Sequence, residues 1–490
     1  MNKYIGIDLG TSSVKALLVG SDGAIIKSTS REYPIFYPQS GWSEQSPADW
    51  LNATINAICD LVAEVDKKSV KGISFGGQMH GLVALDKNDE VIRPAILWND
   101  GRTQAQSDYL NEKIGKAVLS DYTANISFAG FTAPKILWME QNEKSNFERI
   151  EKIMLPKDYL VYKLSGVHAT DYSDASGMLL LDVKNKCWSK KMCEICHVKE
   201  EWLPTLYESY EAVGTLKEEI AELTGLEKSV VICAGAGDNA AAAIGTGTVK
   251  NGSCNISLGT SGTVFISRDS FSVDSKNALH SFCHANGAYH LMGCILSAAS
   301  CNKWWMENVI ESNDYAGEQK DLFKYLGKND LYFLPYLMGE RSPHNDTDAK
   351  GAFIGLRPDT TRKQMTLAIM EGVTFALRDC VEIARQGGVN IESTLICGGG
   401  AKNEIWRAVV ANILGVEVKR PQIEEGPSYG GAILAMVGCG EYESVEQATK
   451  RLVRTQDSIL PSEELVELYN QKYEVFKRLY PALKDVYKLI

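Results

Sequence analysis

The sequence of 490 residues contains no apolar run that approaches the ~20 residues needed to cross a bilayer. Its first residues also lack the features of a secretory leader, because no basic segment, apolar core or cleavage site precedes the strand-like run that begins at Tyr4. Low-complexity linkers are missing as well. We therefore expect a cytoplasmic protein that has no membrane partner.

The sequence also lacks an excess of positive charge. Lys and Arg number 51 against 62 Asp and Glu, which gives a net charge of −11 at pH 7. A chain this acidic is poorly suited to bind nucleic acid or an anionic membrane, so neither partner is expected. With 44% hydrophobic and 23% charged residues, the composition is that of a globular protein with two sizeable cores.

A disulfide framework is not indicated either, because the 12 cysteines are scattered and many lie inside apolar runs. Cys193, Cys196 and His197 match the spacing of a c-type haem attachment motif, and the two thiols could bind zinc. Haem attachment would require export, and zinc would require further ligands that this region lacks. We interpret the match as a chance pattern on a helix.

The most informative stretch that is present runs from Tyr4 to Leu18. An apolar segment ends at Asp8, the chain turns at Gly10, and hydroxyl residues including Thr11 and Ser12 precede a second apolar segment. This pattern predicts strand, turn and strand, with amides and hydroxyls that can bind phosphate oxygens. The carboxylate would suit a magnesium ion that accompanies a nucleotide. The alternative is an ordinary polar hairpin turn.

The same pattern recurs near the middle of the chain, where Leu9–Ser12 is repeated as Leu258–Ser261 between two strand-like runs. Recurrence at half the chain length indicates a duplicated unit. Asp8 is matched by Ser257, so only one of the two turns carries a carboxylate. Two facing phosphate turns of this kind would hold a nucleotide asymmetrically, as a phosphoryl-transfer enzyme requires.

A second pair of segments supports the duplication. The runs 230–239 and 394–403 each read as a strand, a glycine turn and the start of a helix, an arrangement suited to anions. Neither matches the P-loop or a clean dinucleotide motif. Aligning the two places Ala401 opposite Asp238. We predict an N-terminal domain over 1–248 and a C-terminal domain over 249–490.

Asp238 is the candidate catalytic residue because it starts a helix directly after a glycine turn. We predict that the field of the helix keeps its carboxylate ionised and lowers its pKa. Such a group is a weak base, but phosphoryl transfer chiefly needs the attacking hydroxyl to be positioned. The alternative role is that of a plain helix-capping aspartate.

Two loops in the first half suggest a small polar ligand. Trp98, Asn99 and Asp100 combine a flat apolar face with hydrogen-bonding groups, a mixture that suits a sugar or polyol. The glycine-rich loop 76–81, which carries His80, follows a buried strand. A turn with a core tryptophan and a structural histidine are the alternatives. The long region 109–226 reads as an insertion that forms the substrate pocket.

With these residues identified, the chain resembles the actin-like ATPase superfamily and, within it, the FGGY carbohydrate kinases. The likeness covers nearly the whole chain and rests on the two Leu-Gly-Thr-Ser turns, the turn Gly398–Ala401, and the motifs Gly77–Gly81, Trp98–Arg102, Phe131–Lys135, Leu155–Tyr159 and Gly339–Asn345. The resemblance implies an α/β fold in which two ribonuclease-H-like domains are hinged around a central cleft.

The resemblance also implies ATP-dependent phosphorylation of D-xylulose at its 5-hydroxyl, giving D-xylulose 5-phosphate and ADP, with Mg²⁺. By motif, Asp238 would be the base and Asp8 would lie at the metal. Together with the loops above, sugar contacts are expected from Gln78, Met79, His80, Trp98, Asp100 and Asn239. Nucleotide contacts are expected from Thr11, Ser12, Lys15, Gly259, Thr260, Gly399, Gly400, Ala401 and Asn403.

Two rival hypotheses remain open at this point. One is another kinase of the same family that acts on ribulose, gluconate, glycerol or a related polyol. The other is a polymerising or chaperone-type ATPase of the actin-like superfamily, which would turn over ATP without sugar. Stereochemical preference and the extent of hinge motion stay undetermined, and a homodimer is considered alongside a monomer.

Overall fold

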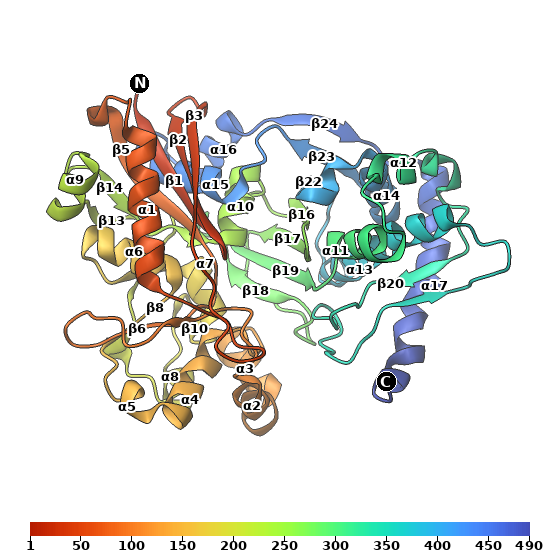
Figure 1. Cartoon of the computed structure of the whole chain (residues 1–490), viewed down its shortest axis with the longest axis horizontal. Helices are drawn as coiled ribbons and strands as arrows, with labels where there is room; N and C mark the ends of the chain where they lie inside the picture. The colour runs from red at the N-terminus through yellow and green to blue at the C-terminus, as the bar shows by residue number, and fades with distance from the viewer.

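The computed structural model describes residues 1–490 and contains two lobes, each built on a seven-stranded sheet (Figure 1). The first half of the chain forms the lobe on the left of the view, and most of the second half forms the lobe on the right. Each lobe has its own large hydrophobic core, a third core fills the insertion, and a fourth lies at the junction. No helix is long and apolar enough to cross a bilayer.

The first sheet consists of β1 (Lys3–Leu9), β2 (Ser13–Gly20), β3 (Ile25–Glu32), β5 (Val70–Gly77), β13 (Ala212–Thr215), β14 (Val231–Cys233) and β15 (Ala236–Gly237). Its order is β13-β14-β5-β1-β2-β3, with β15 beside β5. β1 pairs antiparallel with β2 and parallel with β5. The interior of β1 is almost wholly buried, as expected of a central strand that is covered on both faces.

The second sheet consists of β16 (Cys254–Leu258), β17 (Gly262–Arg268), β18 (His280–Cys283), β19 (Tyr289–Ile295), β22 (Ser393–Cys397), β23 (Glu417–Pro421) and β24 (Thr455–Ile459). Its order is β18-β19-β17-β16-β22-β23-β24. Apart from the extra strand β18, the order and the strand directions repeat those of the first sheet. The duplication predicted from the two Leu-Gly-Thr-Ser turns is therefore confirmed.

The predicted alignment of the second pair of segments is wrong. β22 is the parallel neighbour of β16, so its counterpart is β5, the parallel neighbour of β1, and not β14. The helix that Asp238 begins, α10 (Asp238–Thr246), accordingly matches α15 (Gly426–Gly438), which follows β23. Ala401 instead matches the loop that contains Met79. Glycine turns follow several strands of each lobe, and only strand pairing identifies the equivalent ones.

The first lobe carries the larger insertion. Residues 78–230 connect β5 to β14, whereas residues 398–416 make the equivalent connection in the second lobe. The insertion holds β6 (Val83–Leu85), β7 (Ala95–Ile96), α2 (Gln104–Asp108), α3 (Lys116–Thr123), α4 (Thr132–Asn142), α5 (Lys144–Phe147), β8 (Lys152–Met154), α6 (Pro156–Ser165), β9 (Ala169–Asp171), α7 (Tyr172–Ala175), β10 (Leu181–Asp182), β11 (Cys187–Trp188), α8 (Lys190–Ile195), β12 (Thr205–Tyr207) and α9 (Glu218–Thr224).

Helices cover the outer faces of both sheets. In the first lobe, α1 (Pro47–Val62) begins at a proline and buries Trp50, Ile58 and Leu61 on one face, and it packs on β2 and β3.

The remaining elements are β4 (Glu44–Gln45), α11 (Ala299–Trp304), α12 (Tyr315–Gln319), β20 (Tyr332–Leu334), β21 (Ala352–Ile354), α13 (Arg362–Gln386), α14 (Glu404–Leu414), α16 (Val445–Leu452) and α17 (Glu463–Tyr487).

The two lobes meet where α10 and α15 cross (Figure 1). A Cβ added at Gly430 would collide with the carbonyl oxygen of Ala241, and one added at Gly245 would collide with that of Gly426. The absence of side chains lets the two backbones touch. Although α15 belongs to the second half of the chain, it packs against β1 and β5 of the first sheet. This crossing fixes how the sheets face each other.

We predict that Gly430→Ala destabilises the protein by about 3 kcal/mol, because the new methyl group overpacks a backbone contact. The melting temperature should therefore fall below that of the unmodified chain. Gly101→Ala is the matched control, since its added Cβ would meet nothing closer than the oxygen of Gly41 at 3.6 Å. Equal melting temperatures for the two variants would show that the crossing is not tightly packed.

Candidate active site

Asp8 lies near the end of β1 and Asp238 directly follows β15, and these two strands flank β5 on either side. Asp8 on β1 pairs with Gly76 on β5, and Gly76 in turn pairs with Ala236 on β15, two residues before Asp238. The charge of Asp238 is one of the factors that raise the pKa of Asp8. The sequence prediction that the two acids share one site is supported by this geometry.

The predicted pKa shift of Asp238 has the wrong sign. Burial raises the pKa of this carboxyl to about 6, although the backbone and side-chain amides of Asn239 donate hydrogen bonds of 2.7 and 2.8 Å to Oδ1 and oppose the shift. Loss of hydration therefore outweighs the favourable end of the helix. An acid with a pKa near 6 is a better proton acceptor at neutral pH than the predicted weak base.

Burial and the charge of Asp238 raise the pKa of Asp8 to about 7, while the ammonium of Lys15 opposes the rise. Lys15 lies opposite Asp8 on β2 and forms an ion pair with Glu425, which immediately precedes α15. The two half-buried acids therefore have little neutralising charge beside them. Such a pair fits a hard divalent cation that would bind through Asp8 and complete its shell with phosphate oxygens and water.

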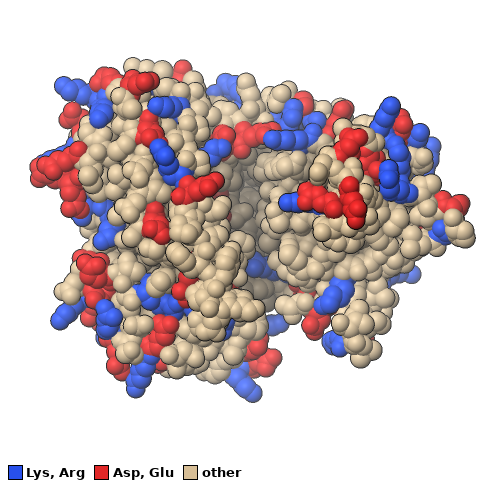
Figure 2. All heavy atoms as spheres, viewed as in Figure 1, with Lys and Arg blue, Asp and Glu red and all other residues tan.

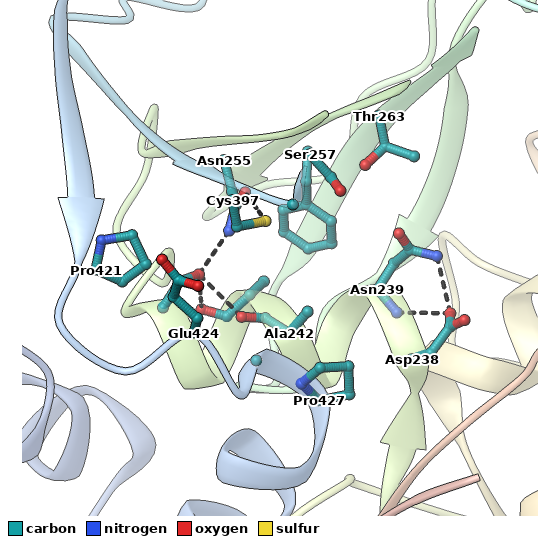
Figure 3. A pocket seen from close by; sticks show the side chains of 15 residues that line it. Asp238, Asn239, Ala242, Asn255, Ser257, Thr263, Cys397, Pro421, Glu424 and Pro427 are labelled. Carbon is teal, nitrogen blue, oxygen red and sulfur yellow. Dashed lines mark hydrogen bonds between the residues drawn. The ribbon is translucent and has the colours of Figure 1, made fainter. Parts of the chain in front are cut away.

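A crevice of about 220 Å³ opens in front of Asp238, and the surface is hollowed along the junction of the lobes (Figure 2). Figure 3 shows Asp238 and Asn239 on α10 on one side and Asn255 and Ser257 on β16 on another. Ser257 is the counterpart of Asp8, so this wall of the second sheet is uncharged. Glu424 also lines the crevice, and sequence reasoning missed both this residue and its neighbour Glu425.

A larger pocket of about 720 Å³ lies wholly in the second lobe. Five predicted nucleotide residues line it, namely Gly259, Thr260, Gly399, Gly400 and Asn403. Sequence reasoning missed several others, including Ser300, Lys303, Tyr315, Gln319 and Trp406. Asn403 caps α14 through a bond from the amide of Trp406 and donates to Gln319 Oε1 at 2.5 Å.

Ala401 is the exception among the predicted nucleotide residues, because its side chain is buried beneath the glycine turn and does not line the pocket. Ala401 contributes to the turn through its backbone, because its amide donates a hydrogen bond to the oxygen of Gly398 at 3.1 Å. Ala401 therefore does not line the pocket, and its place near the adenosine stays a prediction.

The first phosphate turn is tied to the predicted sugar-binding loop. Trp98 Nε1 donates to Thr11 Oγ1 at 3.0 Å, and the amide of Gly10 donates to the oxygen of Ser13 at 3.0 Å. The side chain of Ser12 is exposed. The indole ring of Trp98 is 40% exposed, so the prediction of a core tryptophan in a turn does not apply.

His80 follows β5 with a positive φ of 70°. Its Nδ1 donates to the carbonyl oxygen of Gly177 at 2.8 Å, and a Cβ on Gly177 would collide with the imidazole. Burial, reinforced by the ammonium of Lys135, lowers the pKa of His80 well below its usual value. The ring is therefore neutral and stacks on Phe131 at 4.6 Å between centroids. Its Nε2 is left as a hydrogen-bond acceptor.

Gln78 and Met79 precede His80 and connect it to β1 and β15, the strands that carry or precede the two acids. The amide of Gln78 donates to the oxygen of Leu9 at 2.8 Å, and its Nε2 donates to Gln45 Oε1 at 3.0 Å. The buried Oε1 of Gln78 has no partner and can accept a further hydrogen bond. The side chain of Met79 packs against Gly237, directly before Asp238.

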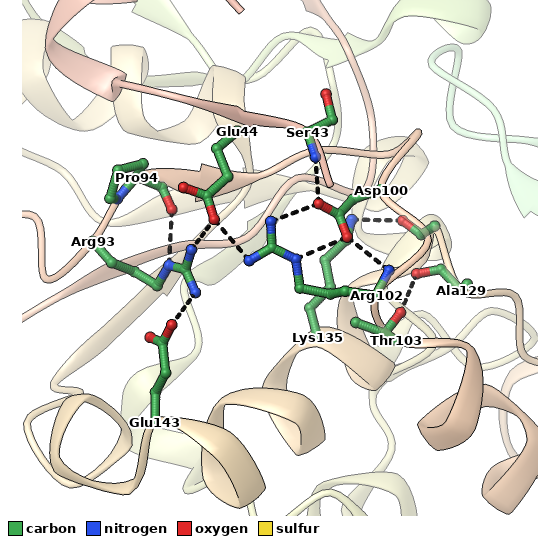
Figure 4. Close-up of polar contacts among 11 residues, drawn as sticks. Ser43, Glu44, Arg93, Pro94, Asp100, Arg102, Thr103, Ala129, Lys135 and Glu143 are labelled. Carbon is green, nitrogen blue, oxygen red and sulfur yellow. Dashed lines mark hydrogen bonds and ion pairs between the residues drawn. The ribbon is translucent and has the colours of Figure 1, made fainter. Parts of the chain in front are cut away.

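The predicted sugar contact of Asp100 is not supported. Its Oδ1 accepts bonds from the amide and Nε of Arg102, and its Oδ2 accepts from Arg102 Nη2 and the amide of Ser43 (Figure 4). These four bonds, all between 2.6 and 2.9 Å, use every acceptor site of the carboxylate. Glu44 extends the network by pairing with Arg102 and Arg93. Asp100 therefore supports the loop that presents Trp98.

A cleft of about 530 Å³ spans the lobes beside this loop. Trp98 and Phe128 line it from the first lobe, and Glu340 and Arg341 line it from the second. The guanidinium of Arg341 lies 5.4 Å from the ring centre of Phe128. Sequence reasoning recognised the motif around Arg341 but assigned it no site role.

The Cys193 and Cys196 thiols are buried on α8, whereas His197 is exposed and contacts Glu140 at 2.8 Å. No group of three or more His, Cys, Asp or Glu side chains in residues 1–490 is arranged to hold a metal ion. The interpretation of this motif as a chance pattern stays a prediction.

Two family models match the chain: the N-terminal domain of the FGGY family of carbohydrate kinases over residues 3–245 and the C-terminal domain over residues 254–439. The xylulose kinase of Bacillus subtilis (strain 168) is 38% identical over 490 aligned residues, covering 99% of this chain and 98% of that protein. The xylulose kinase of Escherichia coli (strain K12) is 38% identical and covers 98% of this chain and 99% of its own.

Among solved structures, a xyloylose kinase from Brucella ovis has a TM-score of 0.94 at 38% identity, covering 99% of this chain and 100% of its own. The predicted fold, two ribonuclease-H-like domains of the actin-like ATPase type around a cleft, is confirmed by these matches and by the repeated sheets. The chain belongs to the FGGY family of carbohydrate kinases and is a phosphotransferase with an alcohol acceptor.

Proposed function

We propose that this chain transfers the γ-phosphoryl group of ATP to the 5-hydroxyl of D-xylulose. The named relatives support the choice of sugar. The placement of Asp238 is the observation that supports the assignment of the reacting groups. Its side chain lines the crevice between the lobes, and its charge acts on Asp8. The preceding residue, Gly237, packs on Met79.

The sugar would bind where the loop after β5 meets the insertion. The free Nε2 of His80 supplies an acceptor for a sugar hydroxyl, and the exposed Trp98 supplies apolar surface. Asn239 contributes its amide oxygen, since its Nδ2 is bonded to Asp238. These groups are neutral and suit the hydroxyl groups of a polyol.

The nucleotide would bind with its base in the 720 Å³ pocket of the second lobe and its phosphates directed to the crevice. Gly259, Thr260, Gly399 and Gly400 present backbone groups on this route, and Thr11, Ser12 and Lys15 present donors from the first lobe. Lys15 would exchange its partner Glu425 for phosphate oxygens.

The residues around Asp8 fit Mg²⁺, because two half-buried carboxylates are neutralised only in part by Lys15. When bound, this ion neutralises charge on the transferring phosphoryl group. Asp238 orients the 5-hydroxyl in line with the phosphorus and accepts its proton as the new P–O bond forms. Its pKa of about 6 leaves most of the carboxylate ionised at pH 7 and still able to hold a proton.

Closure of the lobes would bring the two half-sites together and exclude water from the crevice. The two lobes would move about the crossing of α10 and α15, with α15 remaining on the first sheet although it belongs to the second half of the chain. Closure driven by sugar would limit hydrolysis of ATP by water, which separates this proposal from an ATPase that works without sugar.

The direct test is a coupled assay of ADP release with Mg²⁺ and a panel of D-xylulose, D-ribulose, L-ribulose, gluconate and glycerol. We expect the highest kcat/KM with D-xylulose and almost no ADP release without a sugar. A different preferred polyol would reject the assigned substrate but keep the kinase, while equal ADP release without any sugar would favour the ATPase alternative.

Asp238→Asn should reduce kcat by several orders of magnitude, because the amide cannot accept the proton of the hydroxyl. Binding of ATP, measured by calorimetry, should be unchanged, since the adenosine pocket lies in the other lobe. Asp359→Asn, which changes an exposed carboxylate in the same way, serves as the control. A kcat near that of the unmodified protein would refute the role of Asp238.

The raised pKa of Asp238 also predicts a pH-dependent cost in stability. The folded protein holds this proton up to about pH 6, whereas the unfolded chain releases it near pH 3.8, so folding becomes less favourable as the pH rises through this interval. At pH 8 Asp238→Asn should therefore be more stable than the unmodified chain by up to about 3 kcal/mol. The difference in melting temperature should vanish near pH 4, and a variant that is less stable at pH 8 would contradict the assigned burial.

A further inference from the structure

A buried cluster of charges lies beside β15, the strand that leads to Asp238. Lys157 Nζ is 2.6 Å from Asp158, 2.9 Å from Asp171 and 3.7 Å from Asp174, and all four side chains are inaccessible to solvent. Burial alone would lower the pKa of Lys157, but the three carboxylates outweigh it and raise the pKa. None of these residues faces the crevice or the nucleotide pocket, so the proposed mechanism leaves the cluster without a role.

The cluster is connected to the catalytic strand through one hydroxyl group. Ser173 Oγ donates to Asp171 Oδ2 at 2.5 Å and accepts the backbone N–H of Gly237 at 3.1 Å. Asp171 is in turn fixed by Lys157 and by a bond of 2.6 Å from Ser209 Oγ. The hydroxyl of Ser173 therefore cannot rotate freely, and its free lone pair is directed at the residue before Asp238.

Gly237 is also constrained from its other side. A Cβ at this position would lie 2.9 Å from the sulfur of Met79, and β15 pairs with β5 through Gly237 and Gly77. The peptide of Gly237 is thus held between the sugar-binding loop and α7, the short helix that carries Ser173. Asp238 follows by a single peptide bond, so the position of Gly237 sets where its carboxylate points.

We propose that Ser173, held by Asp171 and Lys157, is a positioning residue that aims Asp238 at the hydroxyl of the sugar. The inference rests on the proposed function, because it assumes that Asp238 is the proton acceptor. It assigns a purpose to the buried cluster: Lys157 fixes Asp171, Asp171 fixes the hydroxyl of Ser173, and Ser173 fixes the amide of Gly237.

Lys157 is not the residue to change, because its removal would leave three buried carboxylates without a cation and would unfold the chain. Ser173→Ala and Ser209→Ala make a matched pair. Each variant removes one hydroxyl donor from the same oxygen of Asp171, but only Ser173→Ala releases the amide of Gly237. Ser173→Cys keeps the shape of the side chain and weakens the hydrogen bond, and it replaces Ser173→Ala if that variant does not fold.

The experiment compares kcat and KM for D-xylulose and ATP in the full chain and its variants. We expect kcat to fall roughly 10- to 100-fold in Ser173→Ala, in the range that a misplaced catalytic group produces. KM for ATP should be unchanged, Ser173→Cys should be intermediate, and Ser209→Ala should lose far less kcat than Ser173→Ala, because it leaves the bond to Gly237 in place.

Equal kcat values for Ser173→Ala and Ser209→Ala would overturn the proposal. It would also be overturned if the loss of kcat followed the loss of melting temperature in both variants. Failure of the proposed function is recognised separately. In that case the unmodified chain itself would not phosphorylate D-xylulose, whereas the positioning role fails only when the unmodified chain is active and the serine variants do not differ.

Discussion

Contact between the bare backbones of α10 and α15 is the constraint on which the rest of the structure depends. Glycines at 245 and 430 allow the helices to approach until no side chain fits between them, so each helix packs at the junction of the lobes. Asp238 begins one helix, and Glu425 immediately precedes the other. Without this approach the two sheets could not place a sugar loop and a nucleotide pocket on either side of one crevice.

In the proposed function, the duplicated lobes use equivalent positions for different ligands. The turn after β5 carries Gln78, Met79 and His80 beside the proposed sugar site, whereas the matching turn after β22 carries Gly399 and Gly400 and lines the nucleotide pocket. A side chain is useful where hydroxyl groups must be recognised, and its absence is useful where a backbone must lie against a large ligand. The first turns of the two lobes also differ, because Asp8 supplies a carboxylate where its counterpart Ser257 supplies a hydroxyl group.

The sequence predicted the features that are encoded locally. The repeated Leu-Gly-Thr-Ser turns, the place of Asp238 at a helix start and five residues that line the 720 Å³ pocket followed from motifs and resemblance. The errors concern long-range structure: the role of Asp100 depended on Ser43, 57 residues away, and the sign of the shift at Asp238 depended on burial. The match of Ala401 to Asp238 failed because strand pairing, which no local pattern encodes, decides which glycine turns are equivalent.

The central claim is that one crevice unites Asp8 and Asp238 of the first lobe with a nucleotide held by the second. A crystal structure of the chain with D-xylulose, Mg²⁺ and a non-hydrolysable ATP analogue tests it most directly. The account predicts that the carboxylate of Asp238 accepts a hydrogen bond from the 5-hydroxyl, that this oxygen faces the γ-phosphorus, and that Asp8 lies at the metal. A 5-hydroxyl directed away from Asp238, or a γ-phosphate outside the crevice, would contradict it.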